Sequence, residues 1–342
     1  MICSQGCRQR DARRAPTRSR AGVAALAVLV AITPAASAAL RVVATTPSLA
    51  DIARNIGGRF VKVESVMRGP ENIHNVKARP SHMIKLRKAD LFIHSGLDGE
   101  LWAPNLIKGS RNRKLRPGQP GNVNVSRGIK LKEVPARGGG ASRALGDIHV
   151  FGNTHYSLDP LNGVIIARTI ANAFKKADPK HAEVFEKNYQ SYAKTLREMT
   201  KRLQAQLAPY RGTPIVVYHR MWPYFRDRFG IVKAAEVEPK PGITPGPNHL
   251  AECVDTMKEK DVRIVIVETF NSKKNAETVA QRAGGKAIVM SQEVNAIKGV
   301  DTYQKMFEYN VNKLIEAFKE VGIEPRASAA ATDGHAAGGA TP

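Results

Sequence analysis

The chain has 342 residues, enough to bury one large core or, more in keeping with its length, two medium ones. Its formal net charge of +23 would suit a nucleic-acid binder, but lysine and arginine are scattered along the whole chain and no aromatic-basic motif accompanies them. We therefore expect no nucleic-acid partner. After residue 38 the only cysteine is Cys253, which excludes an internal disulfide and a thiolate metal site there.

The first 38 residues have the pattern of an export signal. Six arginines precede an apolar stretch over 21–32, and Ala36-Ser37-Ala38 offers a small-x-small cleavage site. The apolar stretch is too short to span a bilayer comfortably. No cysteine follows it, so we expect no lipoprotein anchor. The pattern predicts a signal peptide over 1–38 that exports the protein by the general secretory route.

Strands and helices alternate from residue 40 onward. Short apolar, β-branched runs predict the strands, and apolar residues at helical spacing predict the helices. In the first half of the chain the predicted strands cover 40–45, 60–66 and 90–94, and the predicted helices cover 48–56, 82–89 and 160–176. This order implies a parallel sheet covered by helices. Loops rich in helix-breaking residues are expected over 117–121 and 137–141.

The longest helical pattern in the chain covers 179–207, with apolar residues such as Phe185, Leu196 and Leu203 at helical spacing. At about 1.5 Å per residue this helix would be roughly 40 Å long. The alternation then resumes. The predicted strands are 214–218, 231–237, 263–267 and 287–290, and the predicted helices are 220–229, 249–258, 276–283 and 302–319.

These patterns predict an α/β fold of two lobes. Each lobe has a central, mostly parallel sheet flanked by helices, and one long rigid helix bridges the two lobes. We place the N-terminal lobe at 39–178, the linking helix at 179–208 and the C-terminal lobe at 209–325. Residues 326–342 are rich in Ala, Gly, Thr and Ser, which cannot form a core, and we expect them to be a disordered tail.

Three histidines lie in loops at the edges of predicted α/β units: His74, His155 and His219. They are too far apart in the chain to belong to one zinc finger or one helix face. Only a tertiary fold could bring them together, and three imidazoles at one point would form a metal site. His219 directly follows a predicted strand, and ligands of open α/β sheets gather outside the carboxyl ends of strands.

Two carboxylates accompany these histidines. Glu268 follows the apolar strand over 263–267, where it could be a ligand, a hydrogen-bond partner of a ligand or half of a salt bridge. Asp159 lies between His155 and Pro160. It could accept the second imidazole N–H of His155 or cap the helix that begins at Pro160.

The segments around the histidines resemble the zinc/manganese family of ABC-transporter solute-binding proteins, the ZnuA-like group. The similar segments are 71–81 around His74, 89–102, 153–160 around His155, 219–230 beginning with His219, 238–243 and 302–310. The resemblance implies two four-stranded α/β lobes bridged by a rigid helix, with a metal ion in the cleft between them. The first two histidines would come from the N-terminal lobe and His219 from the C-terminal lobe.

The chain departs from the family pattern at one ligand position. Many members have an aspartate ligand in a Leu-Asp-Pro stretch of the C-terminal lobe, where this chain has Met290-Ser291-Gln292. The fourth position around the ion would then be taken by water, by Glu268 or by Glu71.

The second departure is the absence of the long histidine-rich loop found in some zinc importers. Residues 137–145 contain only Gly, Ala, Ser, Arg and Leu. His149 follows this stretch and is either an auxiliary ligand or, as we favour, a surface residue. We expect none of the remaining histidines to be a primary ligand: His82, His94, His181, His249 and His335.

The resemblance implies a periplasmic, high-affinity zinc carrier. It would act as a monomer and deliver the ion to an ABC permease in the inner membrane, and it would not be an enzyme. Three neutral imidazoles plus an oxygen favour tetrahedral Zn2+ over Mn2+, which prefers more oxygen ligands. A manganese carrier is the alternative within the same class.

A zinc-dependent hydrolase is the alternative from another class. Three histidines with one open position are also the arrangement of catalytic zinc sites, and Glu268 could be the general base. The sequence has no His-Glu-x-x-His helix, nucleophile elbow or phosphate loop, which argues against the hydrolase hypothesis. An additional role as a surface adhesin is compatible with the sequence.

Overall fold

The computed structural model describes residues 39–135 and 150–326, which belong to one compact unit. The predicted signal peptide over 1–38, the loop residue His149 and residues 327–342 of the predicted tail lie outside the described residues. Within the described part of the chain, no helix is both long enough and apolar enough to cross a membrane.

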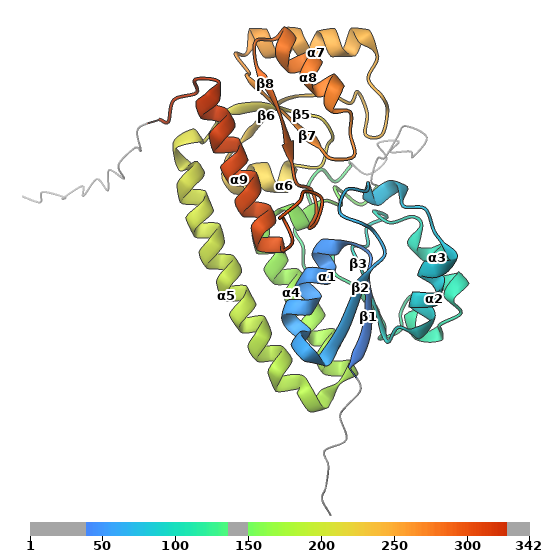
Figure 1. Cartoon of the computed structure of the whole chain (residues 1–342). Coiled ribbons are helices and arrows are strands. Elements are labelled where there is room, and N and C mark those ends of the chain that lie inside the picture. The colour runs from blue at the N-terminus through green and yellow to red at the C-terminus, as the bar shows by residue number, and fades with distance from the viewer. Residues whose placement is uncertain (1–38, 136–149, 327–342) are drawn as a thin grey trace, which may run out of the picture. The chain divides into compact units, whose positions relative to one another are not determined.

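The first sheet contains four parallel strands in the order β2-β1-β3-β4 (Figure 1). Its strands are β1 Leu40–Ala44, β2 Val61–Ser65, β3 Leu91–His94 and β4 Asn122–Asn124. Its helices are α1 Pro47–Gly57, α2 Pro80–Lys88, α3 Ala103–Ser110 and α4 Pro160–Ala177. In the centre, Val42 of β1 lies opposite Val63 of β2 and Leu91 of β3.

Alternate residues along these strands point to opposite faces of the sheet, so two apolar cores form. Val42 and Ile93 pack with residues of α1 and α4, whereas Val43 and Phe92 pack with residues of α2 and α3. Helices therefore cover both faces, which is typical of parallel sheets.

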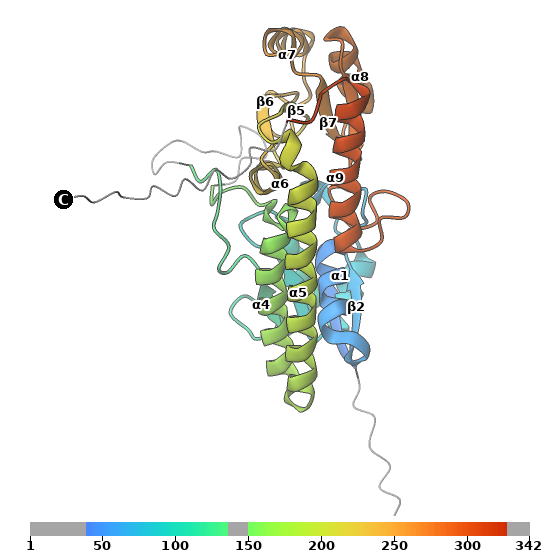
Figure 2. The ribbon, with the colours of Figure 1, turned by 90° about the vertical axis from the view of Figure 1, so that its left-hand side faces the viewer.

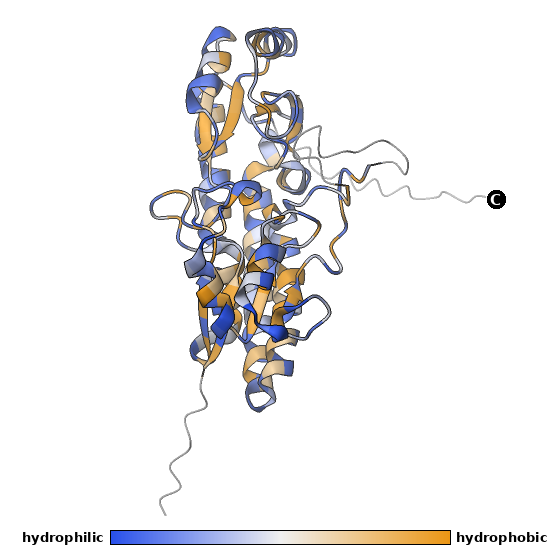
Figure 3. Ribbon diagram, turned by 90° about the vertical axis from the view of Figure 1, so that its right-hand side faces the viewer, coloured by the Kyte–Doolittle hydropathy of each residue, from blue (hydrophilic) through white to orange (hydrophobic). Residues whose placement is uncertain are grey.

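The second sheet has the same architecture, with four parallel strands in the order β6-β5-β7-β8. Its strands are β5 Pro214–Val217, β6 Val232–Glu236, β7 Ile264–Glu268 and β8 Lys286–Met290. Its helices are α6 Pro223–Phe229, α7 Pro247–Glu259, α8 Lys273–Arg282 and α9 Tyr303–Glu320. The central strand β7 is buried along its whole length. Strands coloured orange, as hydrophobic, can be seen in Figure 3.

The 26-residue helix α5 Ala182–Leu207 connects the two sheets along the chain. It packs against α4 and α1 beside the first sheet and against α9 beside the second (Figure 2). Its buried residues belong to one apolar core that also contains Val42 of β1 and Ile264 of β7. Two four-stranded parallel sheets flanked by helices, with one long connecting helix, confirm the predicted fold class. The predicted lobe boundaries stay predictions.

Several elements differ from the sequence prediction at their ends. Helix α5 begins three residues late because Pro179–His181 forms a separate 3-10 turn. Helix α6 begins at Pro223 rather than at 220, because a tight turn precedes it, in which the Met221 N–H donates to the His219 carbonyl at 2.8 Å. Helix α3 and strand β4 were not predicted from the sequence. Helix α3 contains both a proline and a glycine, and β4 is only 3 residues long, so neither has a clear periodic pattern.

A substitution at Leu196 of α5 tests whether the apolar core that α5 shares with both sheets stabilises the protein, because the Leu196 side chain is fully buried in that core. Replacing it with alanine leaves a cavity, and we expect the free energy of unfolding to fall by about 2–5 kcal/mol. Urea denaturation followed by circular dichroism measures this change. Lys194→Ala, on the exposed face of the same helix, is the control and should shift the value by less than about 0.5 kcal/mol. Equal effects of the two substitutions would contradict the shared core.

Candidate metal centre

The fold brings His74, His155 and His219 together. Each offers one ring nitrogen, and these three nitrogens all lie within 4.8 Å of one another. Nε2 of His74 is 3.2 Å from Nε2 of His155. His155 and His219 are buried, and His74 is partly exposed. The tertiary fold therefore brings together three histidines that lie far apart in the sequence.

Each histidine lies in a connection between regular elements. His74 lies in the 3-10 turn Ile73–Asn75 between β2 and α2, and His155 precedes the turn Tyr156–Leu158 that leads into α4. His219 lies two residues after the end of β5. The carboxyl ends of parallel strands meet at one edge of a sheet, and β2 and β5 deliver His74 and His219 to that edge of their sheets.

His74 is oriented by its neighbours in the first sheet. Its Nδ1 lies 3.0 Å from the carbonyl oxygen of Gly99, so Nδ1 carries the proton and donates, and Nε2 keeps its lone pair. The backbone N–H of His74 donates to Asn72 Oδ1 at 2.9 Å. The indole N–H of Trp102 donates to the carbonyl of Ile73 at 2.7 Å. These contacts fix both the ring and the turn that carries it.

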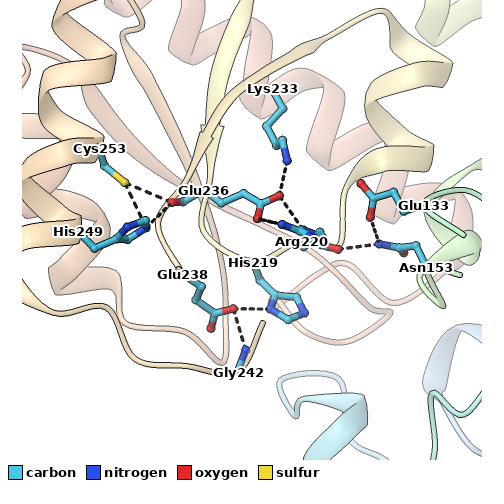
Figure 4. A network of polar contacts seen from close by, with 10 residues as sticks. All are labelled: Glu133, Asn153, His219, Arg220, Lys233, Glu236, Glu238, Gly242, His249 and Cys253. Carbon is cyan, nitrogen blue, oxygen red and sulfur yellow. Dashed lines mark hydrogen bonds and ion pairs between the residues drawn. The ribbon is translucent and has the colours of Figure 1, made fainter. Parts of the chain in front are cut away.

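His219 is oriented by a buried carboxylate. Its Nδ1 lies 2.6 Å from Glu238 Oε2, and the same oxygen accepts the backbone N–H of Gly242 at 3.1 Å (Figure 4). Metal-binding histidines characteristically donate their second N–H to such a partner. The sequence analysis gave Glu238 no role. Glu238 lies just after β6, and β6 pairs with β5, the strand that precedes His219. This position could have indicated that Glu238 lies near His219.

Glu268, the predicted carboxylate ligand, does not belong to the cluster that His74, His155 and His219 form. It ends β7 and is 1% exposed. Its Oε1 accepts the indole N–H of Trp222 and its Oε2 accepts Nδ2 of Asn271 at 2.8 Å. Burial raises the pKa of this carboxyl, and its electrostatic interaction with the nearby His219 and its hydrogen bonds with Asn271 and Trp222 oppose that effect. Both carboxylate oxygens of Glu268 therefore have hydrogen-bond partners in the protein, and its predicted role as a ligand stays a prediction.

The other two carboxylates that the sequence analysis considered also have protein partners. Glu71 pairs with Arg68, whose guanidinium lies 2.9 Å from Oε1. Asp159 caps α4 by accepting the N–H of Leu161 at 2.9 Å, and it binds the guanidinium of Arg228 through both oxygens at 2.9 and 2.8 Å. Of the two roles considered for Asp159, the structure shows the cap.

The segment that departs from the family pattern presents no carboxylate at the aspartate position. Ser291 takes that position and is buried. Gln292, also buried, follows it, and its Nε2 donates to the carbonyl of Gly69 at 3.1 Å, which joins the two halves of the molecule. The next residue, Glu293, accepts the N–H of Ser48 at 2.9 Å. Burial raises the pKa of Glu293 to about 7. A cavity of about 20 Å³, lined in part by His155, Gln292 and Glu293, lies beside these groups.

The chain resembles known metal-binding proteins in its sequence and in its fold. The chain matches the family model described as "Zinc-uptake complex component A periplasmic" over residues 42–317. The manganese-binding lipoprotein MntA of Bacillus subtilis (strain 168) is 30% identical over 295 residues, which cover 82% of this chain and 90% of that protein. The high-affinity zinc uptake system protein ZnuA of Brucella abortus (strain 2308) is 30% identical over 161 residues, 47% of this chain and 48% of that protein.

Solved structures share the fold. A crystal structure of ZnuA superposes with a TM-score of 0.69 at 21% identity and covers 82% of this chain and 99% of that chain. The fold and the sequence matches together define a substrate-binding protein of a metal ABC transporter. Within that class the chain belongs to the ZnuA family, as the sequence resemblance indicated. Members of this family are exported binding proteins, either periplasmic or anchored as lipoproteins.

Glu293 gives the protein a measurable dependence of stability on pH. Since its pKa is raised from 4.5 to about 7, folding favours the protonated carboxyl. This contribution to stability is complete below pH 4.5 and is lost as the pH rises through about 7. Glu293→Gln keeps a neutral group at every pH. We expect the variant to match the wild type at low pH and to be more stable at pH 8 by on the order of 2–3 kcal/mol.

Urea denaturation of both proteins across this pH range measures the difference in the free energy of unfolding. Comparing the two proteins removes the effects of all other titrating groups, which they share. A difference that does not change with pH would contradict the raised pKa.

Proposed function

We propose that this protein is a periplasmic carrier that holds one Zn2+ between His74, His155 and His219 and delivers it to an ABC permease of the inner membrane. The observation that carries the proposal is the convergence of three ring nitrogens within 4.8 Å, two of them on rings whose other nitrogen has a fixed partner. Residues 1–38 would be the signal peptide. The protein would act as a monomer with lobes at 39–178 and 209–325 around the linking helix 179–208.

The composition of the site favours zinc over manganese. Zn2+ is commonly bound by three imidazoles at Zn–N distances of about 2.0–2.1 Å with one further ligand, whereas Mn2+ prefers carboxylate, carbonyl and water oxygens. Two buried carboxylates that interact with His219, Glu238 and Glu268, already accept hydrogen bonds from the protein. The donor to Glu238 is His219, and the donors to Glu268 are Trp222 and Asn271. We therefore assign the fourth position to water, with Glu268 as a supporting group behind the ligands.

A carrier fits the surroundings of the histidines better than a hydrolase does. The cavity that reaches His155 has a volume of about 20 Å³, whereas pockets for organic ligands usually span roughly 300–1,000 Å³. A space of that size suits a water molecule or a single ion. Glu268, the candidate general base, already accepts two hydrogen bonds.

Zinc titration tests the proposed ligands. We expect one zinc ion per chain, measured by elemental analysis and by competition with a chromophoric chelator, and no tight zinc in the triple variant His74→Ala, His155→Ala, His219→Ala. His181→Ala, whose imidazole pairs with Asp178 at 2.6 Å instead, should keep one zinc. Glu268→Gln should also keep it, because an amide can still accept the Trp222 N–H. Equal binding by the wild type and the triple variant would disprove the assignment.

Competition between metals tests the choice of zinc. We expect Zn2+ to displace Mn2+ from the protein at equal concentrations, since three nitrogen ligands suit zinc and lack the oxygens that manganese prefers. Isothermal titration calorimetry with each metal, followed by displacement of Mn2+ by Zn2+, gives the ratio of the two affinities. Tighter binding of Mn2+ would make the protein a manganese carrier. Hydrolysis of esters or phosphates by the zinc-loaded protein that vanished in His219→Ala would instead support the enzyme.

A further inference from the structure

Asn153 connects the segment that carries His155 with the segment that carries His219. It is 5% exposed and lies two residues before His155. Its side-chain Oδ1 accepts the backbone N–H of His155 at 3.0 Å. Its Nδ2 donates to the backbone carbonyl of Arg220 at 2.8 Å, and Arg220 directly follows His219 (Figure 4). One short side chain therefore joins the backbone at one histidine to the backbone next to the other.

The remaining polar groups of Asn153 are also engaged. Its N–H donates to the carbonyl of Lys132 at 2.8 Å, and its carbonyl accepts the hydroxyl of Tyr224 at 2.9 Å. Nδ2 also donates to Oε2 of Glu133 at 3.0 Å. Asparagine suits this position because its amide carries the acceptor and the N–H donors on separate atoms. Ionised aspartate and alanine lack the donor, and serine has only one hydroxyl for both contacts.

Further contacts fasten the same segment to α6. The Tyr224 hydroxyl that binds Asn153 comes from α6, and so does Arg228, which binds both oxygens of Asp159. The segment that carries His155 is thus attached at both ends to the helix that follows His219. His74 has separate support, from Gly99 and Trp102.

We propose that Asn153 is a positioning residue that fixes the separation of His155 from His219 and thereby sets how slowly the site releases its ion. The inference rests on the proposed function, since it concerns the same three histidines. Asn153 is not one of the proposed ligands. It acts through the backbone on either side of the site, in the way that partners behind metal ligands do.

The test is Asn153→Asp, which keeps the shape and the acceptor for the His155 N–H. It replaces the donor with an oxygen that faces the Arg220 carbonyl and the Glu133 carboxylate. We expect zinc affinity to weaken by roughly 10–100-fold, the usual effect of losing a group that orients a metal ligand. Most of the change should appear as faster transfer of zinc to a chelator in stopped-flow measurements.

Cobalt substitution separates positioning from simple loss of stability. The visible absorption of Co2+ reports the geometry of its ligands, and we expect the bands of folded Asn153→Asp to shift relative to those of the wild type. Asn188→Asp is the matched control. It removes a comparable amide bond to a backbone carbonyl, Asn188 Nδ2 to Ile56 at 2.9 Å, far along the chain from the histidines, and should leave zinc release and the cobalt spectrum unchanged.

Asn153→Ser provides a second variant should the aspartate prevent folding. A serine hydroxyl can still accept the N–H two residues on, but it does not replace the amide bond to Arg220. We expect faster zinc release here too. If folded variants at position 153 release zinc at the wild-type rate with an unchanged cobalt spectrum, the positioning role is disproved while the zinc site stands. If the wild type binds no zinc, the proposed function itself fails.

Discussion

The site depends on which nitrogen of each imidazole is available, because a neutral histidine offers a lone pair only from the nitrogen that carries no proton. In His74 and His219 the partners at Nδ1, the Gly99 carbonyl and Glu238, decide this. Glu238 is itself held by the N–H of Gly242. The protein thus prepares the Nε2 atoms before any ion arrives, and an ion that binds to them loses little affinity to the reorganisation of its ligands.

Charge balance is the second constraint on the same region. A divalent ion among three neutral imidazoles brings two positive charges into surroundings where interactions between charges are stronger than in water. Glu238 and Glu268 are both buried near His219, and each accepts hydrogen bonds from the protein. They can offset the charge of the ion from behind the ligands. Their hydrogen bonds also compensate for the burial of the carboxylates themselves.

The sequence was sufficient for the parts of the molecule that local patterns encode. Strand and helix periodicity predicted all four strands of the second sheet, three of the four strands of the first and the long helix, and the loop positions of His74, His155 and His219 singled out these three histidines. The roles of Glu238, Glu268 and Asn153 depend on which side chains meet across the fold, and periodicity contains no such information. Glu268 shows this clearly: its place at the end of β7 fitted a ligand, a partner of a ligand and half of a salt bridge equally, and its hydrogen bonds with Trp222 and Asn271 could not be predicted from its position.

Release of an ion from the proposed site would require at least one of the three histidines to move, and the three are not equally buried. All residues from 152 to 160 are buried apart from Ser157, and His219 is buried as well. Among residues 71–82 only Val76 is buried. Segments with few buried contacts open at the lowest free energy. A displacement of the turn with His74 therefore disturbs the core least, and it would leave the other two histidines held together by Asn153.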